Sequence, residues 1–528
     1  MLARPVEAAR AQRAAEANRV AGVQRFSSGW GGAPLAVKLK SSLPAELKYQ
    51  AVIIEAAARR AGLDFFDVSF ELLSARDVNG VAAYGGFPVR YPSWRFGMEF
   101  ERLQKGYRWG LSKIYELVIN NDPTIAYLVA SNSLLEQKLV MAHVYGHADF
   151  FKHNVWFGPT DRHMLDTMGH HSSRVRRYID AFGAERVERF VDLSLSVETL
   201  INPFRPLRDQ GRVAVPPTAP QPLSERARAS LEALTVPPLG ASAERGAAAG
   251  AGGEPEPVAV AGPALPSYDV MGYLAEHAPV EAWERDLLRM LRREAYYFAP
   301  QRMTKIINEG WASFWHSRLL TGGILEPSEI LDFADCHSTA TATSPGQLNP
   351  YKLGIELFRY AENRGEDIFR LRRVHNDVSL IDELFDEGFV QHALSPEEAR
   401  AQGEIDPDHD WRAQKARLLQ ELAWGGLPKI ELVHADAEGG GELLLVHHHD
   451  GRDLQLGQAE ETLRNLQALW KGPVQLFTLV EGQGRKLICE GGEVRAVDTS
   501  EAQRRCSPEG EASGAAEEGP DSEASENA

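Results

Sequence analysis

Two histidines lie four residues apart in the stretch MAHVYGHADFFKH, which spans residues 141–153. On an α-helix, residues four positions apart lie on the same face, so the side chains of His143 and His147 point in the same direction. Two imidazoles placed in this way can bind one divalent metal ion, with nitrogen–zinc distances of about 2.0–2.1 Å. The alternative is that both histidines face an ordinary helical core and hydrogen-bond to their neighbours. Gly146 lies between them, and because glycine costs a helix about 1 kcal/mol relative to alanine, it indicates close approach of another backbone or a ligand.

The histidine spacing is that of the zinc-protease helix H-E-x-x-H, in which the glutamate is the general base. Val144 occupies the position of that glutamate, so this helix does not carry the usual base. A metal-dependent reaction would need a base from elsewhere, and we consider Glu136, Asp149 and His316 as candidate catalytic residues. His316 is preferred because imidazole titrates near neutral pH. Glu136 could instead support the metal ligands without contacting the ion.

A candidate third ligand is found in INEGWASFWH, residues 307–316. This stretch resembles the N-E-G-aromatic-A segment in which gluzincin-type zinc aminopeptidases carry a glutamate ligand on a second helix. The resemblance implies that Glu309 completes a site with His143 and His147, and that a divalent metal, zinc by expectation, is the cofactor. Three protein ligands leave one coordination position open for catalysis. Glu116 and Glu294 could line the same groove or pair with nearby arginines.

The elements that must position these residues are mainly helical. The histidine pair belongs to a helix that begins near Asn132 or Ser133, both good N-caps, and runs towards Phe157. A long amphipathic helix is predicted from Phe96 to Ile119, and residues 66–74 alternate like a half-buried strand. The segments KIELVHAD, GELLLVHHH, VQLFTLVEG and RKLICE near the C-terminus are typical of strands, with a helix in EETLRNLQALWKG. The sequence therefore predicts a mainly α-helical body with a short strand element, plus a small C-terminal α/β domain.

Composition divides the chain into six parts. Residues 41–203 and 267–425 form the two halves of the helical body, and residues 426–500 form the α/β domain. Residues 204–266 are rich in Pro, Ala and Gly and are expected to be a disordered insertion. Residues 1–40 are expected to be a disordered extension, and residues 501–528 a disordered acidic tail.

The overall charge limits the classes of partner. The 528 residues include 57 Lys and Arg against 74 Asp and Glu, a formal net charge of −17. Such a chain has no general attraction to nucleic acid or anionic lipid, so we expect no nucleic-acid partner. Three scattered cysteines argue against a disulfide framework, and the N-terminus has no apolar signal-peptide core. No segment is apolar enough to span a membrane, and we therefore expect a cytoplasmic protein.

Several long segments resemble the stage V sporulation protein R (SpoVR) family. They include YPSWRFGMEFERLQKGYRWGLSKIYELVINNDPTIAYL, NSLLEQKLVMAHVYGHADFF, NPYKLGIELF and RRVHNDVSLIDELF. The resemblance covers roughly residues 43–203 and 268–395 together with the small C-terminal module. It implies a cytoplasmic bacterial protein linked to sporulation, especially formation of the spore cortex, or to stress signalling. It also implies a PrkA-type serine kinase and a protein with a von Willebrand-like domain as partners.

Two functional hypotheses follow. The first is a metal-dependent hydrolase that acts on an amide or peptide bond, because a bound metal would polarise the carbonyl and activate water. The second is a non-catalytic scaffold or regulatory component of a complex with the kinase and its partner. In the second hypothesis the metal ligands persist to stabilise the fold, and the missing glutamate at Val144 reflects a lost reaction.

Overall fold

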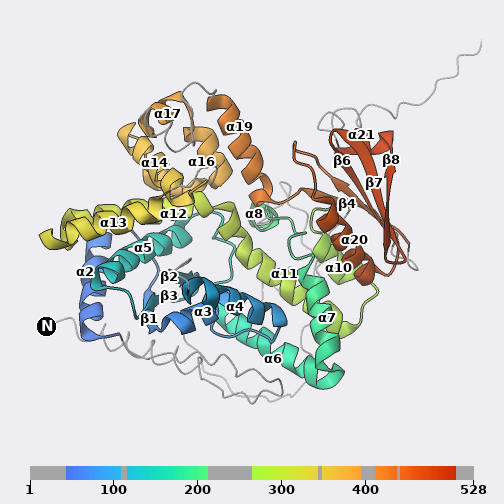
Figure 1. Ribbon diagram of the computed structural model, residues 1–528, viewed down its shortest axis with the longest axis horizontal. Coiled ribbons are helices and arrows are strands. Elements are labelled where there is room, and N and C mark those ends of the chain that lie inside the picture. The colour runs from blue at the N-terminus through green and yellow to red at the C-terminus, as the bar shows by residue number, and fades with distance from the viewer. Residues whose placement is uncertain are drawn as a thin grey trace, which may run out of the picture.

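The computed structural model describes residues 43–108, 116–211, 265–342, 348–393, 411–436 and 441–506. The extension predicted at 1–40 lies outside the described residues, as do most of the insertion predicted at 204–266 and the residues after Cys506. The described chain consists of a mainly helical body and a C-terminal α/β domain, as the sequence predicts (Figure 1). The body holds a small sheet and the helices that position the histidine pair.

The sheet of the body has three strands in the order β1-β3-β2. β1 (Val68–Leu73) confirms the strand predicted at residues 66–74 and pairs in parallel with β3 (Thr124–Val129). β2 (Glu116–Ile119) pairs antiparallel with β3, so that Glu116 lies opposite Leu128. The helix predicted from Phe96 to Ile119 is therefore wrong at its C-terminal end, because α4 (Trp94–Arg108) ends before this strand. The residues Glu-Leu-Val-Ile gain more from pairing with the apolar β3 than from continuing a helix.

Helix α5 (Leu134–His153) carries the histidine pair through the centre of the body. Its N-terminus is a capping box, in which the Ser133 hydroxyl accepts from the Glu136 N–H and the Glu136 carboxylate accepts from the Ser133 N–H. This confirms the predicted start, although the helix ends at His153 rather than near Phe157. Most of its residues are buried on all sides, so α5 is a core helix rather than an amphipathic surface helix.

Helix α12 (Lys305–Leu319) lies between α5 and α14 (Pro350–Asn363) and carries Glu309. It follows directly after the long helix α11 (Ala282–Met303). The backbone N–H groups of Ile306 and Ile307 donate to the two carboxylate oxygens of Asp377, at 3.0 and 2.9 Å. Asp377 thus caps the first turn of α12 from a distant part of the chain, which fixes the position of Glu309 one turn later.

The other helices surround this centre. α2 (Ala45–Arg60) packs against α5, and α3 (Ala75–Ala83) against α4. The remaining helices of the body are α6 (Met164–Phe182), α7 (Ala184–Leu195), α8 (Arg205–Gly211), α10 (Val270–His277), α13 (Ile330–Thr341), α15 (Ile368–Val374), α16 (Asp377–Leu384), α17 (Glu387–Ala393) and α19 (Trp411–Leu422). Among the described residues, no helix is long and apolar enough to cross a membrane.

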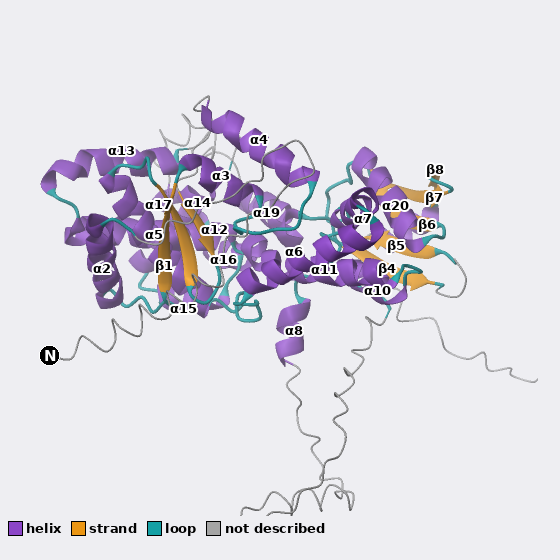
Figure 2. Ribbon diagram, turned by 90° about the horizontal axis from the view of Figure 1, so that it is seen from below, coloured by secondary structure: helices purple, strands orange, loops and turns teal. Residues whose placement is uncertain are grey.

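The C-terminal domain is a five-stranded sheet with one crossover helix, seen at one end of the molecule (Figure 2). Its strands lie in the order β4 (Ile430–Ala435), β5 (Leu443–His447), β6 (Val474–Val480), β7 (Gln483–Glu490) and β8 (Glu493–Asp498). The parallel pair β5–β6 is joined by α20 (Leu456–Trp470), whose apolar face packs with α7, α10 and α11 of the body. The domain is therefore joined to the helical body through a shared hydrophobic core.

Two segments that the sequence predicts to be disordered contain helical residues near their start. The segment 501–506, assigned to the acidic tail, belongs to α21 (Ser500–Cys506), which buries Ala502 and Cys506 against β5 and β6. The apolar contacts of these two side chains outweigh the charged composition around them. The first residues of the insertion predicted at 204–266 form α8, whose Arg205 pairs with the buried Asp269.

Candidate metal centre

Four potential metal ligands from three separate segments converge at one point. They are His143 and His147 of α5, Glu309 of α12 and Glu116 of β2, and their ligand atoms all lie within 4.8 Å of one another. The Nε2 atom of His143 lies 3.1 Å from Glu116 Oε1 and 3.4 Å from Glu309 Oε2. The Nε2 atom of His147 lies 3.7 and 3.5 Å from the same two oxygens. The structure thus brings together the three residues singled out from the sequence and adds Glu116.

The spacing of these atoms fits one small cation. A tetrahedral ion with bonds of about 2.1 Å holds its ligands about 3.4 Å apart. The four nitrogen–oxygen distances in the cluster run from 3.1 to 3.7 Å. Two imidazole nitrogens and two carboxylate oxygens are a donor set that suits zinc, and also iron or manganese. Both histidines present the same ring atom, Nε2, to the shared point, as ligands of one ion would.

Hydrogen bonds behind the cluster orient both imidazoles. His147 Nδ1 lies 2.9 Å from Asn308 Oδ1, so its N–H donates to the amide oxygen and Nε2 is the ring atom left to bind an ion or a proton beside the carboxylates. His143 Nδ1 lies 2.8 Å from His316 Nδ1, and His316 Nε2 lies 3.0 Å from His337 Nδ1. His316 therefore lies behind His143, where it can hold the ligand ring in place. It does not line the cavity next to the cluster, which argues against the expected role of His316 as base.

The charges in the cluster are strongly coupled. Burial raises the pKa of Glu116, but His143 and His147 outweigh burial and lower this pKa to about 2. The pKa of Glu309 is lowered for the same reason. Burial lowers the pKa of His147, whereas the Glu116 and Glu309 carboxylates raise it to about 10. Two largely buried carboxylates thus require positive charge beside them, which either protons on the imidazoles or a divalent cation can supply.

The other two predicted catalytic residues are used elsewhere in the fold. Glu136 caps the N-terminus of α5, seven residues before His143, and this places its carboxylate about two helical turns from the cluster. Asp149 is fully buried and accepts from the Trp311 indole N–H at 2.9 Å and from the Asp64 backbone N–H at 2.9 Å. Its Oδ2 atom also lies 3.2 Å from Arg372 Nε. Neither residue lines the cavity, so the interpretation of Glu136 and Asp149 as bases is not supported by their positions.

Sequence reasoning missed part of the site. The sequence predicts a helix at Glu116 and therefore only a groove residue or an arginine partner there, whereas the structure places Glu116 in β2. Glu294 does pair with an arginine, since its carboxylate lies 2.7 Å from Arg90 Nη2 and 2.7 Å from His171 Nδ1. Tyr351, in the first turn of α14, lines the cavity although no sequence motif indicates a role for it. Burial raises the pKa of the Tyr351 hydroxyl and the Glu309 and Glu116 carboxylates raise it further, so this hydroxyl stays protonated.

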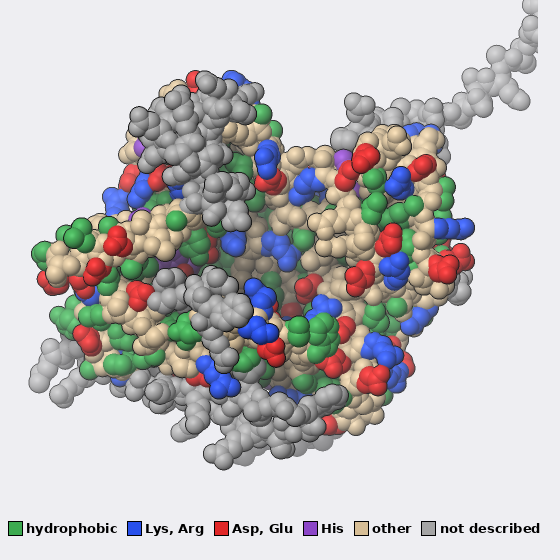
Figure 3. Space-filling model, viewed as in Figure 1, with side chains coloured by type: hydrophobic (Ala, Val, Ile, Leu, Met, Phe, Trp, Pro, Cys, Tyr) green, Lys and Arg blue, Asp and Glu red, His purple; other side chains and the backbone are tan. Residues whose placement is uncertain are grey.

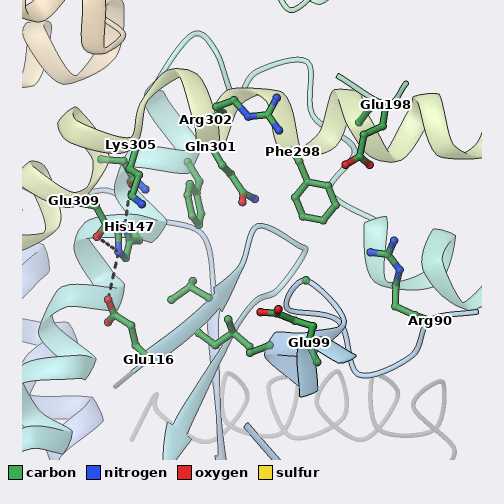
Figure 4. Close-up of a pocket in the computed structure, with 18 of the residues that line it drawn as sticks. Arg90, Glu99, Glu116, His147, Glu198, Phe298, Gln301, Arg302, Lys305 and Glu309 are labelled. Carbon is green, nitrogen blue, oxygen red and sulfur yellow. Dashed lines mark hydrogen bonds and ion pairs between the residues drawn. The ribbon is translucent and has the colours of Figure 1, made fainter. Parts of the chain in front are cut away.

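The cluster faces a cavity of about 870 Å³. His147, Glu116, Glu309 and Tyr351 all contribute to its wall, so an ion bound at the cluster would be accessible from the cavity. Figure 4 shows these carboxylates and His147 at one end, with Arg90 and Glu198 at the other. The molecular surface is hollowed near the middle of the face in Figure 3, with Lys and Arg side chains around the hollow. The volume lies within the range of small-molecule and cofactor sites.

Comparison with known proteins gives the chain a family. The family model described as "SpoVR like protein" matches residues 42–426, and the model described as "SpoVR-like C-terminal domain" matches residues 428–481. The chain is also 28% identical over 484 residues to the uncharacterized protein YcgB of Escherichia coli (strain K12), which covers 80% of this chain and 90% of that protein. No solved structure matches the chain. The two family models together span the helical body and most of the C-terminal domain, and the chain therefore belongs to the SpoVR family.

Proposed function

We propose that this protein is a metal-dependent hydrolase of amide or peptide bonds, with zinc as the expected ion. The observation that carries the proposal is the convergence of two imidazole nitrogens and two carboxylates in the wall of a cavity of substrate size. His143, His147 and Glu309 would hold the ion and leave one coordination position open, and Glu116, the fourth member of the cluster, would act on water at that position rather than on the ion. A bound divalent ion supplies Lewis-acid polarisation of a carbonyl and makes water a better nucleophile near neutral pH.

Glu116 is the residue that would replace the glutamate missing at Val144. It reaches the cluster from strand β2 rather than from the histidine helix, and its carboxylate lies 3.1 Å from His143 Nε2 in the wall of the cavity. An ionised carboxylate at this position can accept a proton from water. In the proposed reaction, the oxygen of water bonds to the carbonyl carbon while Glu116 takes one proton from that water. The carbon–nitrogen bond then breaks, and Glu116 passes the proton to the leaving amine.

In this proposal Tyr351 stabilises the charge that develops on the carbonyl oxygen. Its hydroxyl stays protonated because burial, Glu309 and Glu116 all raise its pKa, and it shares the cavity wall with both carboxylates. A protonated phenol donates one hydrogen bond to an oxygen that gains negative charge. Such preorganised donors are worth about 10²–10³ in rate when they are aimed at the oxyanion.

The test compares the zinc-loaded protein with its Glu116→Gln variant on a mixture of unmodified peptides, with products detected by mass spectrometry. We expect new peptide termini from the wild type and about a hundredfold fewer from Glu116→Gln, because a general base contributes about 10²–10⁴ to the rate. Glu46→Gln, an exposed change on α2, serves as the control and should match the wild type. Elemental analysis must show that all three proteins hold metal. Equal product yields from wild type and Glu116→Gln, or no cleavage by the metal-loaded wild type, would contradict the proposal.

The family name supports a proposal for the biological process in which this reaction takes part. Members carry the name of a sporulation protein, and we propose that the hydrolase acts in the cytoplasm during sporulation or stress signalling. The proposed partners, a PrkA-type serine kinase and a protein with a von Willebrand-like domain, stay a prediction of the family resemblance. Under the alternative of a non-catalytic scaffold in that complex, the Glu116→Gln variant would retain the full biological function of the wild type.

A further inference from the structure

We propose that the cavity beside the metal centre takes a substrate that carries a carboxylate group close to the bond to be hydrolysed. This inference rests on the proposed function and names the class of substrate for the same site. It is based on two cationic side chains, Arg302 and Lys305, at the junction of α11 and α12. Both are exposed, and both contribute to the cavity wall.

Lys305 lies close to the metal ligands along the helix. It precedes Glu309 by four residues on α12, so the two side chains share one face, with their Cβ atoms about 5–6 Å apart. Figure 4 shows Lys305 beside Glu309 and His147, with Gln301 and Arg302 along the same wall. An anion that pairs with Lys305 would therefore lie within about one helical turn of the cluster.

The two cations differ from the other charged groups of the cavity because neither forms an ion pair with a carboxylate in the described part of the chain. The remaining charged side chains of the wall, apart from the cluster, are mostly paired, as Arg90 with Glu294, Arg95 with Asp192 and Glu99 with Arg102. Glu198 attracts Arg302 at longer range, and burial raises the pKa of Glu198. Lys305 and Arg302 are thus available to an incoming anion.

The net charge of the cavity wall near the metal cluster favours a negatively charged ligand. A divalent cation would neutralise Glu116 and Glu309, and Glu198 offsets at most one of the two charges of Lys305 and Arg302, which leaves a positive excess. A protonated amine would be repelled there, whereas a carboxylate would gain charge-assisted hydrogen bonds. This local positive charge occurs in a chain with a formal net charge of −17, so it is not a consequence of overall composition. The carboxylate could belong to an acidic side chain or to a peptide C-terminus.

The test uses two small chelators on the zinc-loaded protein, measured by titration calorimetry. Acetohydroxamate binds through its hydroxamate alone, and succinate monohydroxamate carries the same chelating group with an additional carboxylate. We expect the succinate compound to bind about tenfold more tightly to the wild type, a difference of about 1.4 kcal/mol. In the double variant Arg302→Gln/Lys305→Gln this ratio should fall to about one, while acetohydroxamate binds as before.

The matched control is Lys48→Gln/Arg60→Gln, which removes the same charge from exposed positions of α2 outside the cavity. It should retain the tenfold ratio. The inference is wrong if acetohydroxamate binds but the wild type shows no preference for the succinate compound. It is also wrong if the preference survives in Arg302→Gln/Lys305→Gln. In both cases the metal centre itself is still supported, because the chelator binds. If neither chelator binds the metal-treated wild type, the proposed function fails and the inference fails with it.

Competition against bound succinate monohydroxamate then identifies the source of the carboxylate. One peptide carries an Asp side chain and an amidated C-terminus, and the other has a free C-terminal carboxylate and no acidic side chain. Displacement by the first peptide alone assigns an acidic side chain, and displacement by the second alone assigns a peptide C-terminus. Displacement by neither peptide at millimolar concentration contradicts the inference.

Discussion

Gly146 of α5 lies directly against Ala312 of α12. A Cβ atom placed on Gly146 would lie only 2.7 Å from Ala312 Cα, closer than packed atoms allow. This contact lets the two helices approach until His143 and His147 face Glu309. In the sequence, Gly146 indicates that another backbone or a ligand comes close to this helix. The structure shows that the backbone of α12 does so.

The Gly146→Ala substitution should separate α5 from α12. We expect a loss of about 1–3 kcal/mol in the free energy of unfolding, because the added methyl group meets backbone that cannot move away without shifting the helix. Metal affinity should fall as well, since the histidines and Glu309 lie on the two helices that are pushed apart. Urea denaturation and chelator competition measure the two effects.

Gly169 provides the control for this substitution. It lies inside α6, and a Cβ atom there would meet nothing within 4 Å. Gly169→Ala should leave stability unchanged or raise it by about 0.4–1 kcal/mol, because alanine restricts the unfolded chain. Equal stabilities for Gly146→Ala and Gly169→Ala would show that the approach of the two helices is not what positions the cluster.

Asp149 should prove structural rather than catalytic. The Asp149→Ala substitution leaves Arg372 and the Trp311 N–H without their buried carboxylate, and breaking a buried ion pair costs about 3–5 kcal/mol. We expect the free energy of unfolding to fall by this amount, while the folded variant still binds one metal ion per chain. Asp180→Ala, an exposed change on α6, should have no effect on either quantity. Loss of metal from a fully stable Asp149→Ala protein would refute this assignment.

The stability of the metal-free protein should depend on pH through His147. Its pKa is about 10 in the folded protein, against an ordinary value of 6.5, because the Glu116 and Glu309 carboxylates outweigh the effect of burial. The folded state therefore holds this proton more tightly than the unfolded state. The resulting stability is complete below about pH 6.5 and is lost as the pH rises through about 10.

Urea midpoints of chelator-treated protein, measured across this pH range, test the dependence. We expect the wild-type midpoint to fall as the pH rises, and the His147→Gln midpoint to fall much less because glutamine does not titrate. Parallel curves for the two proteins would contradict the coupling between His147 and the carboxylates.

The part of the site that depends on helical spacing could be predicted from the sequence. The four-residue interval between His143 and His147 sets their common direction, and the N-E-G segment pointed to Glu309. Glu116 could not be assigned in this way because its position depends on pairing with Leu128 of β3, a contact that no local pattern encodes. Tyr351 reaches the cavity through the packing of α14 on α12, which is equally non-local.

The same distinction applies to the fold. Helical periodicity and a cap at Asn132 or Ser133 predict α5, and alternation predicts β1, because these signals are local. The end of α4 and the start of α21 were missed, since tertiary contacts decide them. The two apolar side chains of α21 find a place in the C-terminal core, although the surrounding sequence is strongly charged.

The most direct test of the account is elemental analysis of the protein, purified without chelators and then loaded with zinc, alongside a His143→Ala/His147→Ala variant. The control is His163→Ala/His170→Ala, which removes two exposed histidines of the α6 region. We expect about one metal ion per chain in the wild type and the control, and less than about a tenth of that in the folded His143→Ala/His147→Ala protein. A wild type without stoichiometric metal, or a double variant that binds as much as the wild type, would contradict the metal centre.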